Sequence, residues 1–288
     1  MITFSGLTKI YKSKDGPVHA LGPVSLEIPS GEIHAIMGQS GCGKTTLLHI
    51  VAGFERPTSG CVSMDGQLID KTDSERSMVF QQDALFPFLS VGSNVTFGLR
   101  TLWLNEVIRG RFDQRLAQRI LRFVSEVIPV TDRLDRKRWN HWTNQGKTWL
   151  RRVGLENTFS KLPKHLSGGM RKRVELARAF AVQPKVLLLD EPFASLDPIT
   201  RSAMHGLVEE IWSVERPTVI FSTHDAAEAV ALADRVTVLT KRPGKVLATV
   251  TISLPRPRER KVIRDPSFYK TVQDLEDLIL SDLQEAEK

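Results

Sequence analysis

The sequence has few of the residues that stabilise secreted proteins or form membrane spans. Only two of its 288 residues are cysteines, Cys42 and Cys61, so neither a disulfide framework nor a zinc site is expected, and a reducing compartment is favoured. No apolar run approaches the ~20 residues that cross a bilayer. The first residues lack a charged start followed by a long apolar run, so no secretory signal is predicted. A role at a membrane would therefore need another chain to bring this one there.

The net charge is positive but does not identify a partner. The chain has 40 Lys and Arg against 33 Asp and Glu, which gives a net charge of +7 and an isoelectric point near 9.5. Nucleic acid, an anionic membrane surface and a polyphosphate ligand are all compatible with this charge. Hydrophobic residues make up 41% and charged residues 25%, as in ordinary globular proteins. The length allows one large domain or two modest ones.

The most informative stretch is a glycine-rich turn between the apolar run 33–37 and a predicted helix at 46–51. It reads Gly38-Gln39-Ser40-Gly41-Cys42-Gly43-Lys44-Thr45. Glycines let the backbone wrap closely enough for several N–H groups and the start of the helix to point at one polyphosphate. Lys44 would supply charge to the β- and γ-phosphates, and the Thr45 hydroxyl would bind Mg²⁺. The turn predicts a P-loop, with a glycine turn that binds nothing as the alternative.

Three other apolar runs end in polar residues. The run 186–190 ends in Asp190 and Glu191, the run 78–80 is followed by Gln81, and the run 218–223 is followed by His224. In a doubly wound parallel sheet such ends share one edge, where ligands bind. Asp190 would hold Mg²⁺, and Glu191, expected to face elsewhere, would polarise the attacking water. Taken singly, a glutamine or histidine at a strand end is more often structural.

Residues 1–32 alternate apolar and polar residues with turn signals at 16–17 and 30–31, which predicts antiparallel strands. A second hairpin is predicted over 61–69, turning at Asp65-Gly66. Tyr11 lies between Lys9 and Lys12, so its ring is expected to be exposed and able to stack on a purine. A strand-edge tyrosine without a ligand is the alternative.

A second anion site is predicted at 166–170, Leu166-Ser167-Gly168-Gly169-Met170, just before another helix. Ser167 is a natural N-cap, and the N–H groups of Gly168 and Gly169 would be free to bind phosphate. One chain with one P-loop has no need of a second phosphate site unless another molecule's nucleotide occupies it. The pattern therefore predicts a dimer.

The segment 101–147 differs in composition from the rest. Its ten Lys and Arg and five Asp and Glu carry +5 of the net charge. Its tryptophans are Trp103, Trp139 and Trp142, with Trp149 just beyond. A stripe at helical spacing predicts a helix that Pro129 ends; it comprises Phe112, Leu116, Ile120, Phe123 and Val127. A basic helix packed on the body is slightly favoured over a docking surface for an acidic partner or lipid headgroups.

Together these motifs resemble those of the nucleotide-binding subunit of an ABC transporter. The resemblance covers residues 1 to about 250, apart from 101–147. The matching motifs, in order, are Gly38 to Thr45 (Walker A), Gln81 (Q-loop), Leu166 to Met170 (signature), Val186 to Asp190 (Walker B) followed by Glu191, Ser195-Leu196-Asp197 (D-loop) and His224 (switch histidine). The resemblance implies an α/β P-loop cassette with a mostly parallel core sheet, an antiparallel β subdomain and a helical subdomain. The ABC domain would span 1–250, with the helical subdomain at about 82–178, an insertion at about 101–147 and a short tail at 251–288.

The resemblance also implies how the residues act, with ATP and Mg²⁺ as ligands and two ATP molecules enclosed between two cassettes. ATP would contact Tyr11, Gly38, Gln39, Ser40, Gly41, Cys42, Gly43, Lys44, Thr45 and Thr46, and in trans Ser167, Gly168, Gly169 and Asp197. Mg²⁺ would bind Thr45, Gln81 and Asp190, while Glu191, His224, Gln81 and Lys44 would be catalytic. The implied partners are a second cassette, identical or not, membrane permease subunits and, indirectly, a periplasmic or surface solute-binding protein. The implied location is the cytoplasmic face of a bacterial cell membrane.

A finer resemblance points to the nitrate, sulfonate and taurine importers of bacteria. It is carried by residues 41–48, 84–89, 224–229 and 254–258. Two features depart from the pattern: Met170 replaces the commoner glutamine, and the stretch from Gly98 to Val153 is about twice as long as in related importers. The tail after residue 258 is too short for the large regulatory domain of some sugar importers.

Three alternatives remain from the sequence. A soluble ABC ATPase acting on nucleic acid would use the basic surface, but such proteins usually carry paired cassettes or long coiled coils. A small-molecule P-loop kinase is disfavoured by the signature and the switch histidine. An exporter cassette is disfavoured because exporters commonly fuse the cassette to membrane spans.

Overall fold

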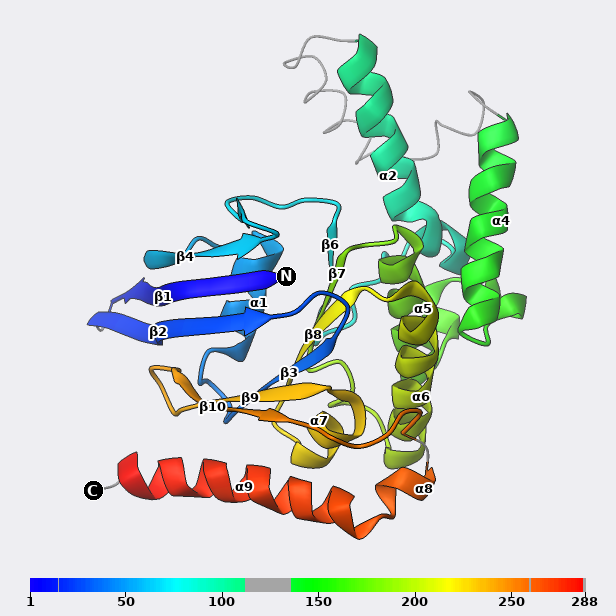
Figure 1. Cartoon of the computed structure of the whole chain (residues 1–288). Coiled ribbons are helices and arrows are strands. Elements are labelled where there is room, and N and C mark those ends of the chain that lie inside the picture. Colours follow the sequence, from blue (N-terminus) through cyan, green and yellow to red (C-terminus); the bar gives the residue numbers. More distant parts are fainter. Residues whose placement is uncertain (15, 112–135, 259, 287–288) are drawn as a thin grey trace. The chain divides into compact units, whose positions relative to one another are not determined.

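The structure is a computed structural model and describes residues 1–14, 16–111, 136–258 and 260–286 (Figure 1). It divides the chain into two compact units. The first comprises Met1–Gln82 and Pro184–Lys288, and the second Asp83–Gln183. In the described part, no helix is long and apolar enough to cross a membrane.

The first unit contains a six-stranded sheet in the order β10-β9-β3-β8-β7-β6. Its strands are β3 (Ile33–Met37), β6 (Arg76–Val79), β7 (Val186–Asp190), β8 (Thr218–Thr223), β9 (Arg235–Leu239) and β10 (Val246–Thr251). Strands β9, β3, β8, β7 and β6 are parallel, and β10 joins β9 in the antiparallel direction. Every residue of β3, β7 and β8 is buried, as expected of central strands covered on both faces. The predicted, mostly parallel core sheet is confirmed.

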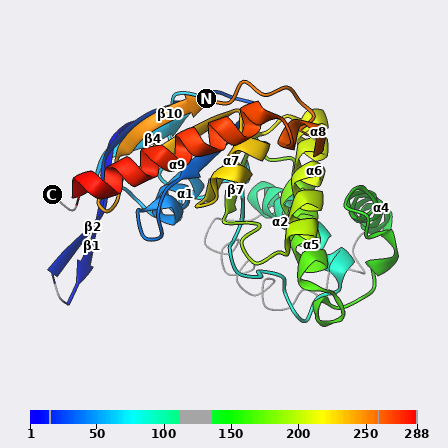
Figure 2. The same cartoon turned by 90° about the horizontal axis from the view of Figure 1, so that it is seen from below.

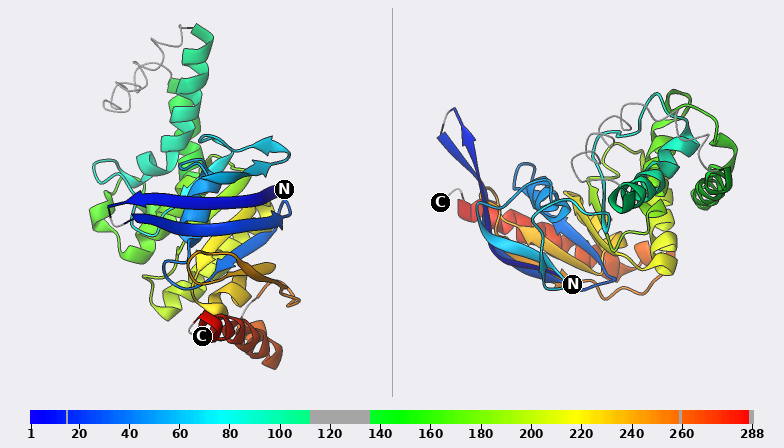
Figure 3. Two further views of the ribbon diagram at one scale, coloured as in Figure 1. Left: turned by 90° about the vertical axis from the view of Figure 1, so that its left-hand side faces the viewer. Right: turned by 90° about the horizontal axis from the view of Figure 1, so that it is seen from above.

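A four-stranded antiparallel sheet in the order β2-β1-β4-β5 belongs to the same unit. Its strands are β1 (Ile2–Ser13), β2 (Gly16–Ile28), β4 (Ser59–Met64) and β5 (Gln67–Leu68), and Figure 3 shows β1 and β2 running side by side. Asp65 and Gly66 have φ angles of 49° and 80°, the left-handed pair that a tight hairpin turn needs. Both predicted hairpins are therefore confirmed.

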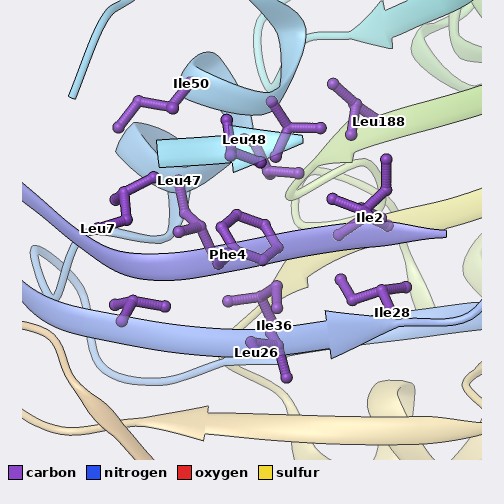
Figure 4. Close-up of a cluster of buried hydrophobic side chains, with 14 of the residues drawn as sticks. Ile2, Phe4, Leu7, Leu26, Ile28, Ile36, Leu47, Leu48, Ile50 and Leu188 are labelled. Carbon is purple, nitrogen blue, oxygen red and sulfur yellow. The ribbon is translucent and has the colours of Figure 1, made fainter. Parts of the chain in front are cut away.

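One buried cluster joins the two sheets to helix α1 (Lys44–Ala52). The antiparallel sheet contributes Ile2 and Phe4, the core sheet Ile36 and Leu188, and α1 contributes Leu47 among others (Figure 4). Burying these side chains supplies the main favourable free energy for packing the antiparallel sheet against α1. The P-loop, which runs between β3 and α1, is therefore anchored to the core at both ends.

The remaining helices of the first unit are α6 (Pro198–Glu215), α7 (Ala226–Leu232), α8 (Arg260–Ile263) and α9 (Pro266–Ala286). Helix α9 lies beside α7, where it buries Phe268 and Leu275 (Figure 2). Arg256 forms ion pairs with Glu209 at 2.7 Å and Asp234 at 2.8 Å. The residues after 251 thus pack within the first unit, and the boundary at residue 250 stays a prediction.

The second unit is helical, with α2 (Val91–Arg111), α4 (Arg136–Arg152) and α5 (Gly168–Ala181), together with 3₁₀ turns at Glu156–Thr158 and Pro163–His165. Trp149 is 6% exposed and stacks on Phe180 with ring centroids 5.8 Å apart. Trp103 and Trp142 meet edge to face at 5.4 Å. These three tryptophans pack within the helical unit, and the choice between a packed basic helix and a docking surface stays a prediction. The stripe from Phe112 to Val127 and the side chain of Trp139 lie outside the described residues.

Candidate functional site

The P-loop adopts a conformation that only glycine permits at key positions. Gly43 has a φ of 106°, and a Cβ there would lie 2.6 Å from Leu21 Cδ2 and 2.9 Å from the carbonyl oxygen of Ala20. The chain enters α1 directly afterwards, so the first N–H groups of the helix lie at the loop. Lys44 Nζ donates to the carbonyl oxygens of Gly38 (2.8 Å) and Gln39 (3.1 Å) and is only 5% exposed. The lysine charge is thus held at the loop.

The other loop residues divide into exposed and packed ones. Ser40, Gly41 and Thr45 are exposed, and Gln39 is partly buried. Cys42 is buried, and burial raises the pKa of its thiol, with Lys44 opposing the rise. Cys42 is therefore an apolar packing residue beneath the loop and not a reactive thiolate.

Thr45 and Asp190 meet across the end of the core sheet. The Thr45 hydroxyl donates to Asp190 Oδ1 at 3.0 Å, and the Ser222 hydroxyl donates to the same oxygen at 2.7 Å. Ser222 pairs with Asp190 in the β7–β8 register, a contact that sequence reasoning missed because only strand pairing indicates it. A hydroxyl and a carboxylate are oxygen ligands of the kind that Mg²⁺ prefers, so this pair fits the predicted metal site.

Glu191, the residue after Asp190, turns its carboxylate toward the P-loop. Its φ of 40° is in the left-handed region, and its N–H donates to Ser222 Oγ at 2.9 Å. Its carboxylate lies 3.5 Å from Lys44 Nζ and 3.5 Å from His224 Nδ1, and it accepts from Gln81 Nε2 at 3.4 Å. The left-handed backbone breaks the strand alternation at this residue, and its role toward the attacking water stays a prediction.

His224 is 60% exposed, at the start of the segment that leads into α7. The Asp225 side chain caps that helix by accepting from Glu228 N at 3.0 Å, and Arg201 of α6 donates to the other Asp225 oxygen at 3.2 Å. Glu228 is buried and accepts from the Thr223 hydroxyl at 2.8 Å. Burial, chiefly, raises the pKa of Glu228 to about 7. The sequence alone does not assign these supporting roles, because the contact with Arg201 and the burial of Glu228 arise only in the folded chain.

Tyr11 is half-buried, not exposed as predicted. Its hydroxyl donates to Glu55 Oε2 at 2.5 Å and lies 3.4 Å from Thr46 Oγ1. Lys9 Nζ lies over the ring, 4.9 Å from its centroid. Burial and the hydrogen bond to Glu55 raise the pKa of Tyr11. The ring is therefore held beside α1, the helix that follows the P-loop.

The signature residues belong to the second unit. Ser167 caps α5, as predicted, and its Oγ accepts from Met170 N at 3.3 Å. Gly168 is exposed and Gly169 partly buried at the start of the helix. Asp197, in the first unit, is also exposed and caps α6, accepting from the N–H groups of Ile199 and Thr200; hydrogen bonds from Thr200 lower its pKa. Contact of these residues with another molecule's nucleotide stays a prediction.

Comparison with known proteins agrees with this arrangement. The family model described as ABC transporter matches residues 21–194. The nitrate import ATP-binding protein NrtD of Synechocystis sp. is 36% identical over 284 residues, which cover 96% of this chain and 94% of the relative. The bicarbonate transport ATP-binding protein CmpD of the same organism is 34% identical over 271 residues, covering 93% and 85%.

A solved structure supports the same assignment. A dimeric ATP-binding cassette in a post-hydrolysis state, bound to ADP and Pi, is similar with a TM-score of 0.67 at 27% identity, covering 88% of this chain and 99% of that one. The match extends over nearly the whole of that cassette. The chain therefore belongs to the ABC transporter family, as an ATP-binding subunit whose ATP hydrolysis is coupled to transport.

Proposed function

We propose that this subunit powers the import of a small anion, of the class to which nitrate and bicarbonate belong, through a membrane permease. Two relatives that align with nearly the whole chain carry the names of nitrate import and bicarbonate transport proteins. The permease and a solute-binding protein would select the solute, since the cassette binds only nucleotide. The cassette would sit on the cytoplasmic face of the membrane, attached to the permease.

The observation that carries the proposal is the convergence of a lysine, a carboxylate, an amide and a histidine at one end of the core sheet. Lys44, Gln81 and His224 all lie within 3.5 Å of the Glu191 carboxylate. Three of these residues follow or end separate parallel strands, and Lys44 begins the P-loop helix. Such a set can bind a polyphosphate and move a proton beside it.

Each side chain has a step that its position suits. Lys44 binds the β- and γ-phosphates, and the N–H groups of the loop bind the remaining phosphate oxygens. Glu191 accepts the proton of the attacking water, whose oxygen then bonds to the γ-phosphorus while the bond to ADP breaks. His224 donates to the γ-phosphate, and Gln81 orients Glu191 and the water. When bound, Mg²⁺ would be held by Thr45, Asp190 and Gln81 and would neutralise phosphate charge.

A second cassette would complete the site. Ser167 and Gly168 lie exposed and Gly169 partly buried at the start of α5, where N–H groups and the helix dipole favour an anion. Asp197 lies exposed at the start of α6. We expect these residues to contact the nucleotide held by the other molecule's P-loop. Hydrolysis would then open the dimer and move the attached permease subunits.

The variant Glu191→Gln tests the mechanism. It keeps the shape of the side chain but cannot accept the proton, so ATP binding should be retained and turnover should fall by about 100-fold or more. Nucleotide titration and phosphate release measure the two properties separately. Glu210→Gln, the same change at an exposed position on α6, is the matched control and should hydrolyse ATP normally. Near-normal hydrolysis by Glu191→Gln would remove Glu191 from its assigned step.

The transported solute is tested with the assembled transporter. The chain should co-purify with its permease subunits, and nitrate or bicarbonate presented with the binding protein should raise the ATPase rate of the reconstituted complex. If only an organic sulfonate raises the ATPase rate, the transported solute is an organic anion and not an inorganic one. Failure of the chain to associate with any permease would contradict the importer assignment.

A further inference from the structure

A cluster of polar side chains connects Tyr11 to helix α1 and has no part in the chemistry described above. Its centre is Glu55, which follows α1 and is 26% exposed. The Glu55 carboxylate accepts from the Tyr11 hydroxyl at 2.5 Å, lies 3.1 Å from Lys9 Nζ and lies 3.3 Å from His49 Nδ1. One carboxylate thus links strand β1 to the last turn of the P-loop helix.

The protonation states in this cluster favour a strong hydrogen bond. Burial alone would raise the pKa of Glu55, but hydrogen bonds from Tyr11, Lys9 and His49 outweigh burial and lower it. The pKa of Tyr11 is raised, so its phenol stays protonated as the donor. A neutral hydroxyl donating to an ionised carboxylate is one of the stronger hydrogen bonds in proteins.

The cluster also determines which face of the Tyr11 ring is available. The hydrogen bond to Glu55 fixes the direction of the Tyr11 side chain and therefore the place of its ring. Lys9 Nζ lies over one face at 4.9 Å and is itself held by the carbonyl oxygen of Arg56 at 2.8 Å. The cation occupies that face by a cation–π contact, so a ligand could stack only on the opposite face.

We propose that Glu55 is a positioning residue of the nucleotide site, holding the Tyr11 ring so that the face opposite Lys9 stacks on the base of ATP. The inference depends on the proposed function, because Tyr11 can act as a platform only if the P-loop binds the triphosphate of the same nucleotide. Glu55 touches neither phosphate nor metal in this scheme. It contributes to affinity only through the aromatic ring, and this property distinguishes it from the P-loop residues.

The test compares ATP with inorganic tripolyphosphate, which has no base. Glu55→Ala should weaken ATP binding by about tenfold, the lower part of the range for losing one base–aromatic stack, and leave tripolyphosphate binding unchanged. Glu55→Gln keeps an acceptor for the Tyr11 hydroxyl and should restore much of the affinity. Equilibrium titration of the purified full chain measures both ligands, and a thermal melt of each variant verifies that it is folded.

A double-mutant cycle tests whether Glu55 acts through the tyrosine hydroxyl. Tyr11→Phe removes the hydroxyl and keeps the ring, so Glu55→Ala should have little further effect on ATP affinity in that background. Glu27→Ala, at an exposed carboxylate of β2, is the control and should bind both ligands normally. Additive losses in the double variant would overturn the proposal, as would an equal loss of ATP and tripolyphosphate affinity in Glu55→Ala.

The same titrations distinguish failure of this inference from failure of the proposed function. Lys44→Ala should lose both ligands, because the lysine contacts phosphate. If the wild type bound neither ligand, the proposed function would fall and this inference with it. If the wild type binds both ligands but Glu55→Ala and Glu55→Gln both bind ATP normally, the inference alone is wrong.

Discussion

The variant Glu228→Gln should stabilise the protein in a way that depends on pH. Glu228 is 6% exposed, and its Oε1 is buried without a hydrogen-bond partner in the described structure. Its pKa rises from 4.5 to about 7, chiefly by burial and also through the nearby charges of Asp225 and Glu191, while Thr223 and Arg201 oppose the rise. Glutamine has the same size and can accept from Thr223, but it cannot ionise.

The sign of the effect follows from proton linkage. The folded state holds a proton that the unfolded chain has already lost, so the contribution of Glu228 to stability is full below pH 4.5 and is lost as the pH rises through 7. A shift from 4.5 to about 7, at 1.36 kcal/mol per unit, corresponds to about 3 kcal/mol. The free energy of unfolding of Glu228→Gln should exceed that of the wild type by about 3 kcal/mol at pH 8 and by less than about 1 kcal/mol at pH 5.

His205 also makes the stability of the protein depend on pH, in the wild type and in the variant alike. Burial, with a smaller contribution from Arg201, lowers the pKa of His205 from 6.5 to about 4. Its contribution to stability is therefore present above pH 6.5 and is lost as the pH falls toward 4, opposite in direction to that of Glu228. The two effects partly cancel between pH 4.5 and 6.5. Subtracting the stability of the wild type from that of Glu228→Gln at each pH removes the effect of His205 and leaves that of Glu228.

Thermal melts of the full chain across pH 5 to 8 measure this difference. A gain of about 3 kcal/mol would raise the Tm by roughly 6 to 12 °C at pH 8, on the scale of domains of 150 to 250 residues. Glu210→Gln, at an exposed position of α6, should change the Tm little and by the same amount at every pH. A difference for Glu228→Gln that is absent, or constant between pH 5 and 8, would refute the argument from burial.

Two further substitutions test the P-loop and the helical unit. Gly43→Ala should reduce ATP affinity at least tenfold in a nucleotide titration, because the added Cβ would lie 2.6 Å from Leu21 Cδ2 at a φ of 106°; unchanged affinity would show that the loop adapts. Trp149→Ala should lower the free energy of unfolding of the helical unit by about 3–5 kcal/mol, measured by denaturant titration, because it empties a buried site stacked on Phe180. Trp149→Phe keeps an aromatic ring at this site and should lower the free energy of unfolding clearly less than Trp149→Ala. Equal losses of stability in the two variants would contradict the stacking argument.

Much of the site could be predicted because its signals are local. The glycine spacing of residues 38–45 predicts the P-loop, and the apolar runs that end at Asp190 and lead to Gln81 and His224 predict strands with ligand-binding ends. The strands and the loop form as predicted, because a buried parallel strand needs a continuous apolar run and the loop needs glycine at left-handed positions. Ligand binding at the strand ends stays a prediction. The N-cap Ser167 and the Asp65-Gly66 turn follow from the same kind of short-range chemistry.

What the sequence determined by itself is therefore the class of fold, the phosphate-binding motifs and the family. Only the tertiary structure decided that Glu191 turns toward Lys44, that Ser222 shares the oxygen of Asp190 that Thr45 contacts, and that Glu55 holds Tyr11. These contacts join residues that lie far apart in the chain, and strand register and one left-handed backbone angle bring them together. No periodicity within a short window carries that information, because the energy of such a contact depends on how separate elements pack.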